Sequence, residues 1–193
     1  MLTLWAAAVA EAQGQPWESA LTFGQRIAAM FAQSKGRSLG VFEPPSEEES
    51  AEQAARRTRE RIGAFPVAVF GTSVLARTDP SDRTGSGRAF AAAGAGVAKP
   101  ASAAAYLRRA FGERLPAATA ALRRLAAAVP AAELQRPGVA YRLYCRIRPE
   151  VPLGVAGWGA RGAFDVAAVD ALAEQLEAER NGKGEGEEGG AAA

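Results

Sequence analysis

Residues 65–75 read FPVAVFGTSVL, an apolar run that lies before the middle of the chain and is interrupted by Gly71. Short apolar runs rich in β-branched and aromatic residues are typical of buried strands. A glycine inside such a run indicates a bulge or a turn. The segment therefore predicts a sheet in a chain whose other apolar residues recur largely at helical spacing.

A second strand is predicted at residues 138–148, GVAYRLYCRIR, where the residue types alternate. One face of this strand would carry Tyr141, Leu143, Cys145 and Ile147. The other face would carry Arg142, Tyr144, Arg146 and Arg148. Alternation with a period of two is typical of a half-buried strand, so the first face, with the Cys145 thiol, is expected in the core.

Helices are predicted between and around these strands. Apolar residues recur at helical spacing over Trp17–Phe31, Pro116 opens a helix that stops before Pro130, and Asp165 caps a last helix that ends at Asn181-Gly182. Together with the two strands, these segments predict an α+β fold, in which several helices cover a small antiparallel sheet.

The chain has 193 residues, of which 48% are hydrophobic, enough for one core. We expect a single domain over residues 15–180 with a flexible loop at 36–46. An apolar segment, residues 1–14, would precede it, and a disordered tail rich in Gly and Glu, residues 181–193, would follow.

The apolar start, MLTLWAAAVAEA, loosely resembles a signal peptide but has no basic residue ahead of its apolar stretch. An ordinary N-terminal helix is the favoured interpretation, and a secreted form with a cleaved N-terminus is the alternative. No apolar run reaches the roughly 18–20 residues of a membrane span. The one cysteine fits a reducing compartment, so we expect an intracellular protein of the cytoplasm or nucleus.

Histidine is absent from the chain, and Cys145 is its one cysteine. A Ser-His-Asp or Cys-His arrangement cannot be built from this chain alone, and neither can a structural zinc site. Asp79 and Asp82, three residues apart, could share Mg²⁺, but turn chemistry is the favoured interpretation. No glycine-rich segment matches a phosphate-binding loop. We therefore expect no catalytic residue, metal or cofactor, with an enzyme that uses carboxylate or lysine chemistry as an alternative.

Charge is distributed unevenly along the chain. Residues 1–50 hold three basic and six acidic side chains, residues 151–193 hold three and eight, and residues 51–150 hold seventeen and seven. A basic middle thus lies between acidic ends. Such asymmetry indicates an acidic partner, which could be nucleic acid, a membrane surface, an acidic protein or the protein's own ends.

The predicted basic strand face, Arg142, Tyr144, Arg146 and Arg148, is the most specific positive feature, and Arg123 and Arg124 add charge on a neighbouring helix. Arginines bind phosphates bidentately, and a tyrosine among them can stack on a base. The alternatives are a solvated outer face, or a face that acidic groups from either end of the chain cover.

Phe42 and Trp158 are candidate anchors for a protein partner, although a glycine-flanked tryptophan more often packs back onto the core. The leading hypothesis is a non-enzymatic interaction subunit that contacts nucleic acid or an acidic partner. A protein–protein adaptor without nucleic-acid contact is the second hypothesis, and its binding segment would be the Trp17–Phe31 helix or the residues around Phe42.

Overall fold

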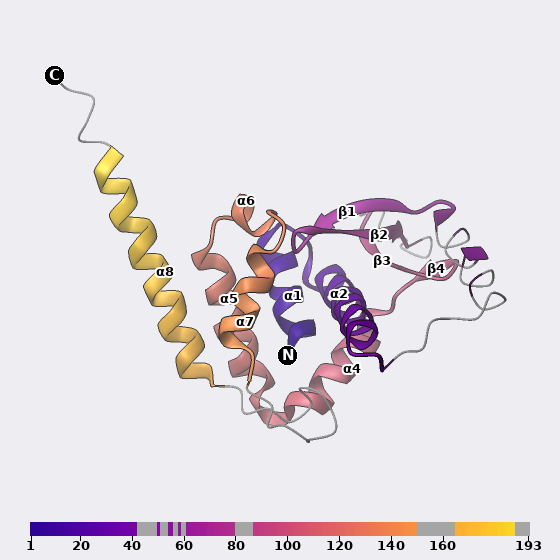
Figure 1. The fold of residues 1–193 in the computed structure, drawn as a ribbon, viewed down its shortest axis with the longest axis horizontal. Coiled ribbons are helices and arrows are strands. Elements are labelled where there is room, and N and C mark those ends of the chain that lie inside the picture. Colours follow the sequence, from indigo (N-terminus) through magenta and orange to yellow (C-terminus); the bar gives the residue numbers. More distant parts are fainter. Residues whose placement is uncertain are drawn as a thin grey trace.

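The computed structural model describes residues 1–41, 50, 54–55, 58, 61–79, 87–149 and 165–187, with side chains through residue 182. Its elements are α1 (Leu2–Ala12), α2 (Trp17–Ser38), β1 (Phe65–Val69), β2 (Thr72–Thr78), β3 (Ala89–Ala93), β4 (Gly96–Val97), α4 (Pro100–Phe111), η1 (Gly112–Arg114), α5 (Leu115–Ala128), α6 (Ala131–Leu134), α7 (Val139–Ile147) and α8 (Val166–Glu187). Helices lie below and beside one small sheet, which confirms the predicted α+β class (Figure 1).

Helix α1 lies at the centre of the core, where it contacts α2, α5 and α7 (Figure 1). All residues from Thr3 to Ala10 are buried. Alanines on α1 and Gly24 on α2 bring the two helices together: a Cβ on Gly24 would lie 2.4 Å from the carbonyl oxygen of Thr3. The apolar start of the chain is thus part of the same core cluster as the rest of the fold.

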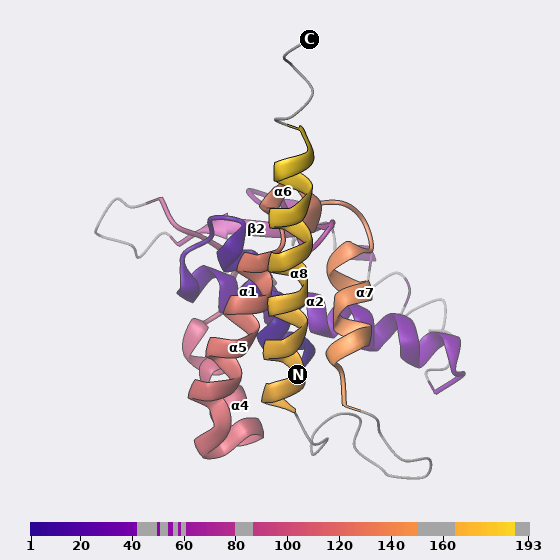
Figure 2. The same cartoon turned by 90° about the vertical axis from the view of Figure 1, so that its left-hand side faces the viewer.

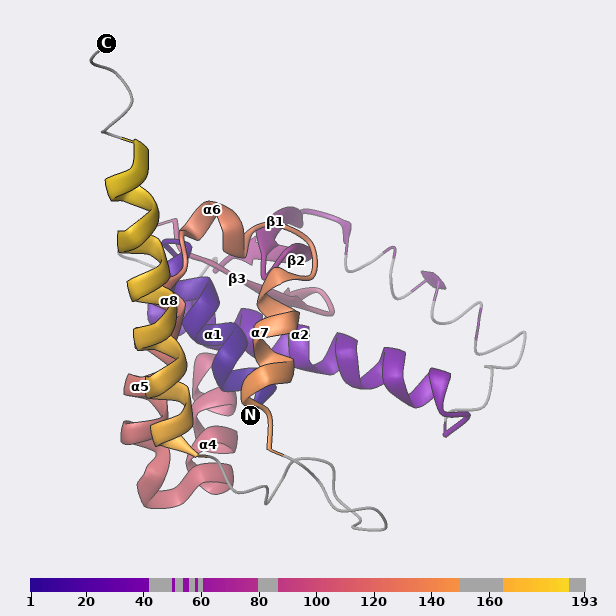
Figure 3. The same ribbon diagram turned by 60° about the vertical axis from the view of Figure 1, so that its left-hand side comes forward.

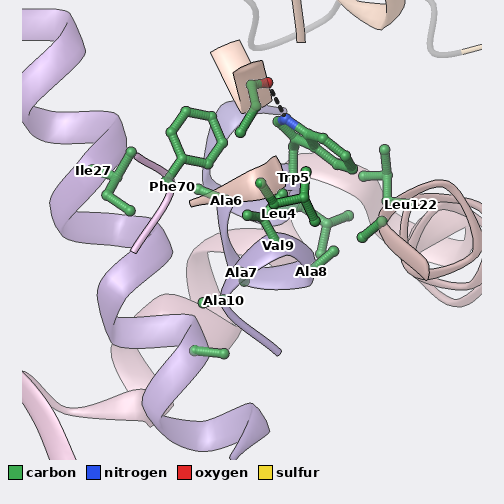
Figure 4. Packing of buried hydrophobic residues seen from close by; sticks show 14 of the residues in the cluster. Leu4, Trp5, Ala6, Ala7, Ala8, Val9, Ala10, Ile27, Phe70 and Leu122 are labelled. Atoms are coloured by element: carbon green, nitrogen blue, oxygen red, sulfur yellow. Dashed lines mark hydrogen bonds between the residues drawn. The ribbon is translucent and has the colours of Figure 1, made fainter. Parts of the chain in front are cut away.

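Trp5 supplies the largest fully buried side chain of this core. Its indole Nε1 donates a hydrogen bond of 2.8 Å to the carbonyl oxygen of Ala140 on α7 (Figure 4). Leu122 of α5 and Ile27 of α2 belong to the same buried cluster. The buried indole fills space in the core, and its hydrogen bond also holds α7 in place against α1.

The sheet is an antiparallel meander in the order β1-β2-β3-β4. Val69 pairs with Thr72, so two residues, Phe70 and Gly71, connect β1 to β2. Both have positive φ, 60° and 68°, the geometry of a type I′ hairpin turn. The glycine in the first quoted segment therefore marks a turn between two strands.

The turn residue Phe70 is held in an unfavourable backbone conformation by its surroundings. Its side chain is buried and its N–H donates to Oε1 of Gln13 at 3.2 Å. A Cβ on Gly71 would lie 2.6 Å from the carbonyl oxygen of Arg136. The hairpin turn is thus packed against the segment that leads into α7.

Residues 139–147 form helix α7, so the predicted strand over Tyr141–Ile147 is wrong. The same residues also fit a helical period: Ala140 and Leu143 are buried and Ile147 is partly buried, at positions i, i+3 and i+7. Residues 89–97 complete the sheet instead, a segment whose Ala- and Gly-rich composition gives no clear signal.

The other predicted helices are present with shifted ends. Helix α2 continues through Gly36 to Ser38, into the segment expected to be a loop, of which residues 42–46 lie outside the described residues. Asp165 Oδ1 accepts a hydrogen bond of 3.1 Å from the Ala168 N–H, the expected cap of α8. Helix α8 continues past Gly182 to Glu187, and the rest of the expected tail lies outside the described residues.

The structure brings the two acidic ends of the chain to its basic middle. Helix α8 packs against α5, and α1 packs on α5 from inside the fold (Figures 1 and 2).

Of the helices in the described part of the chain, none has the length and apolar character that crossing a membrane requires.

Candidate anion-binding face on helix α7

Helix α7 presents one face to the core and the other to solvent. The buried side chains Ala140 and Leu143 and the Trp5 hydrogen bond to Ala140 hold its inner face. On the opposite side of the helix, Arg142, Cys145 and Arg146 are exposed. Contacts with the core therefore hold the inner face of α7, and its outer face is exposed.

Three exposed arginines gather on and just after this helix. Arg142 and Arg146 are one turn apart, about 6 Å along the axis at 1.5 Å per residue. Arg148 is exposed directly after the last helical residue. Within the described part of the chain, none of the three guanidinium groups has a carboxylate partner. We call these three residues the α7 arginine face.

Arg123 of α5 is in a different situation. Its guanidinium forms two hydrogen bonds to the Glu11 carboxylate, of 2.5 and 2.8 Å, and lies 4.2 Å from the centroid of the Trp17 ring. A bidentate pair that also stacks on an aromatic ring holds the guanidinium firmly in place. Arg123 thus connects α5 to the acidic N-terminal part of the chain.

Arg124 is similarly occupied by the C-terminal part of the chain. Its Nη2 lies 3.1 Å from Glu174 Oε1 and 3.4 Å from Asp170 Oδ1, both on α8. Of the six predicted basic-face residues, the structure therefore separates Arg123 and Arg124, which bind intrachain carboxylates, from the four on or next to α7. The acidic partners lie far away in sequence, and no local pattern marks them.

An aromatic cluster adjoins the α7 arginine face on its α2 side. The Phe31 and Tyr141 rings are stacked, with centroids 4.7 Å apart and planes 3° from parallel. Phe31 also meets Phe70 edge to face at 6.0 Å, and Tyr141 lies 6.0 Å from Tyr144. The two Phe31 contacts join α2 to the hairpin turn and to α7, and they pair residues too distant in sequence for periodicity to reveal. Tyr141 and Tyr144 are three residues apart on α7.

Tyr144 lies between the aromatic cluster and the charged residues. Burial raises the pKa of its phenol above the ordinary value, Arg148 opposes that rise, and the Tyr141, Cys145 and Tyr106 side chains add to it. Tyr106, on α4, is 41% exposed. An aromatic ring and a guanidinium thus flank the Tyr144 side chain.

Cys145 is exposed, so the prediction that it lies on a core face is wrong. The error has the same cause as the strand assignment, because a helix turns residue 145 away from the side that Leu143 occupies. The two candidate anchors, Phe42 and Trp158, lie outside the described residues.

No group of three acidic, cysteine or histidine side chains that could hold a metal ion occurs in the described part of the chain. The charged side chains described above on α5 and α7 are arginines, some of them paired with carboxylates, and aromatic rings lie beside α7. Such an arrangement can bind anions and aromatic groups through its surface.

Comparison of the chain with known protein families, with characterised proteins and with solved structures finds no match. The function is therefore argued from the geometry.

Proposed function

We propose that this protein is a non-enzymatic binding subunit whose α7 arginine face binds the phosphates of a nucleic acid. The observation that supports this proposal is that three exposed arginines gather on and directly after one helix. Arg88, Arg123 and Arg124 have intrachain carboxylates at 2.6, 2.5 and 3.1 Å, whereas the three of the α7 arginine face have none among the described residues.

Arginine chemistry favours phosphate as the ligand of this face. The guanidinium is planar, weakly hydrated and always charged, and it binds phosphate with two parallel hydrogen bonds. Residues 131–149 contain four arginines and one acidic side chain, Glu133, so the local field is positive. A multivalent anion is needed to engage several such groups at once, and a phosphate backbone is one.

The test is fluorescence anisotropy of labelled oligonucleotides over a series of salt concentrations. Counterion release lowers log K with log salt by about 0.7 per phosphate neutralised on a single strand and about 0.9 on a duplex. Three phosphate contacts predict a slope of about −2 to −2.7, to which other basic groups can add. The triple variant Arg142→Gln/Arg146→Gln/Arg148→Gln should remove that part of the slope together with most of the affinity.

A matched control removes the same net charge elsewhere. Arg37, Arg61 and Arg114 are exposed and lie on other elements, so Arg37→Gln/Arg61→Gln/Arg114→Gln lowers the net charge equally. This control should retain most of the binding. Equal losses in both triple variants would show that only overall charge matters, and absence of binding at low salt would refute the proposal.

A protein–protein adaptor is the second candidate, and the free end of α2 favours it. The last turns of α2 extend beyond α7 and the sheet (Figure 3). Met30, Leu39 and Val41 on this end are 37%, 55% and 69% exposed. Exposed apolar residues that form a contiguous patch mark contact surfaces, and these three lie close together in the sequence. Leu39→Asp/Val41→Asp should abolish capture of a protein partner while leaving nucleic-acid binding unchanged.

A further inference from the structure

Helix α8 is held to the fold chiefly by one neighbour. Among the described elements, α5 is the one with which α8 makes an extensive contact. The two helices lie side by side at the edge of the molecule, and the end of α8 extends beyond the rest of the fold (Figures 1 and 3). Helix α1, by contrast, contacts α2, α5 and α7. The packing around α1 therefore does not depend on extensive contacts with α8.

The buried side of α8 has the pattern of a helical docking peptide. Val169, Leu172 and Ala173 are buried, and Leu176 is half-buried. These residues occupy positions i, i+3, i+4 and i+7, which lie along one face of a helix. Amphipathic helices that bind in an apolar groove of another protein use the same spacing. The contact between α5 and α8 thus resembles the binding of a helical ligand.

Polar groups set the position of α8 along α5. Arg124 Nη2 lies 3.4 Å from Asp170 Oδ1 and 3.1 Å from Glu174 Oε1. Further along α8, Arg180 Nη1 donates a hydrogen bond of 3.4 Å to the carbonyl oxygen of Ala127, in the last turn of α5. The last carbonyl groups of a helix have no partner within that helix, so this bond satisfies one of them. The α5 surface therefore matches carboxylates at defined places beside an apolar stripe.

We infer that this α5 surface is a docking site for an acidic amphipathic helix of a partner protein, and that α8 occupies the site in the free chain. The partner helix carries apolar residues at the spacing of α8, with carboxylates that face Arg124. A second copy of the chain is a less suitable occupant, because its own α8 is tethered to its own α5 at a roughly millimolar effective concentration. The inference goes beyond the proposed nucleic-acid binding and does not depend on it, since the α7 arginine face takes no part.

The test measures whether the site accepts a helix from outside the chain. The probe is a fluorescein-labelled peptide with the sequence of residues 165–182, and the protein is the full chain. In the full-length variant Val169→Asp/Leu172→Asp, called the opened variant, α8 loses its apolar contact and the site becomes free. With a roughly millimolar effective concentration and a peptide Kd of about 10–100 µM, the opened variant should bind the peptide about 10- to 100-fold more tightly than the unmodified chain.

Peptide variants test the recognition of carboxylates by Arg124. The peptide with Asp170→Asn/Glu174→Gln should bind the opened variant roughly 3- to 10-fold more weakly, because it lacks both ion pairs. The control peptide with Glu179→Lys has the same net charge, and its exposed substitution should leave binding unchanged. Adding Arg124→Gln to the opened variant should abolish the difference between the unmodified and the Asn/Gln peptide.

Hydrogen exchange of the unmodified chain provides an independent measurement of whether α8 opens. Amides of α8 should exchange faster than those of α1 and α5, because local opening of α8 leaves the contacts around α1 in place. For the same reason the opened variant should still unfold cooperatively in urea.

Each way of failing has its own readout. Amides of α8 that exchange as slowly as those of α1, or an opened variant that does not unfold cooperatively, would overturn the inference by making α8 an inseparable part of the core. Equal peptide binding by the opened and unmodified chains would place the peptide elsewhere. An equal loss with the Glu179→Lys peptide would reduce recognition to net charge. A dimer of the unmodified chain in light scattering would make a second copy the occupant and overturn the inference.

Discussion

Gly24→Ala tests the central packing of the fold, the crossing of α1 and α2. A Cβ at residue 24 would lie 2.4 Å from the Thr3 carbonyl oxygen, 2.8 Å from the Ala7 nitrogen and 3.1 Å from the Ala7 Cβ. Two of these neighbours are backbone atoms of a buried helix and cannot rotate away. The added methyl group therefore requires the helices to separate.

The expected magnitude follows from two opposing effects. Alanine is favoured over glycine inside a helix by about 1 kcal/mol. Overpacking of a well-packed core costs about 1–3 kcal/mol, and occasionally more. Since α1 also contacts α5 and holds α7 through the Trp5–Ala140 hydrogen bond, it has little room to shift. We therefore expect an overpacking cost at the upper end of that range and a net loss of about 2 kcal/mol, which for a domain of this size lowers Tm by about 4–8 °C.

Urea unfolding and thermal melts followed by circular dichroism would measure the change. The matched control is Gly182→Ala in α8, where a Cβ would meet no atom within 4 Å. Helix propensity alone acts there, so the control should be neutral or slightly more stable. A Gly24→Ala protein that unfolds at the same urea concentration as the control would show that α1 and α2 do not cross at this distance.

Three further changes test other parts of the structure. Thr22→Val removes the buried hydroxyl that accepts a 3.0 Å hydrogen bond from the Ala91 N–H, so urea unfolding should show a loss of about 1–3 kcal/mol. Thr22→Ser should recover most of it, and equal stability of both variants would contradict the contact. Cys145 is exposed and should react with a thiol reagent in the native protein, whereas reaction only after unfolding would place it in the core. Burial raises the pKa of Tyr144, so the folded state holds that proton more tightly than the unfolded chain does. This contribution to stability is complete below about pH 10 and is lost as the pH rises above that value. Tyr144→Phe should therefore lose less stability between pH 9 and 11 in urea titrations, and an identical alkaline profile would refute the assignment.

Features that depend on neighbouring residues could be predicted from the sequence. The glycine in 65–75 marks the hairpin turn because few other residues adopt positive φ at low cost. Pro116 lies in the first turn of α5, and Asp165 caps α8, because both act within one turn of their own position. Local chemistry alone therefore indicated a bulge or turn at Gly71 and the starts of two helices.

The segment 139–147 was not predictable in this way, because nine residues satisfy two periods at once. Alternation groups Tyr141 with Leu143, while a period of 3.6 groups Ala140 with Leu143 and Ile147. The hydrogen bond from Trp5 to Ala140 spans 135 residues, and such a tertiary contact favours the helix. Local pattern cannot contain that information, and the misplaced Cys145 follows from the same ambiguity.

The fold shows which arginines of the basic middle are paired with the acidic ends of the chain. Counting charges identifies a basic middle but cannot say which arginines are free. The acidic ends reach Arg123 and Arg124 through Glu11, Asp170 and Glu174, so part of the positive excess is neutralised within the chain.

The α7 arginine face is one of the groups of exposed arginines that intrachain pairing leaves, and the stacked Phe31 and Tyr141 rings lie beside it. A binding surface inferred from average charge would include α5, whereas one inferred from unpaired guanidinium groups does not. These two definitions of the binding surface predict different results for the double variant of Arg123 and Arg124. Arg123→Gln/Arg124→Gln should lower stability and leave the salt slope of nucleic-acid binding unchanged, since those two groups already have carboxylate partners. A reduced slope in that variant would return α5 to the binding surface.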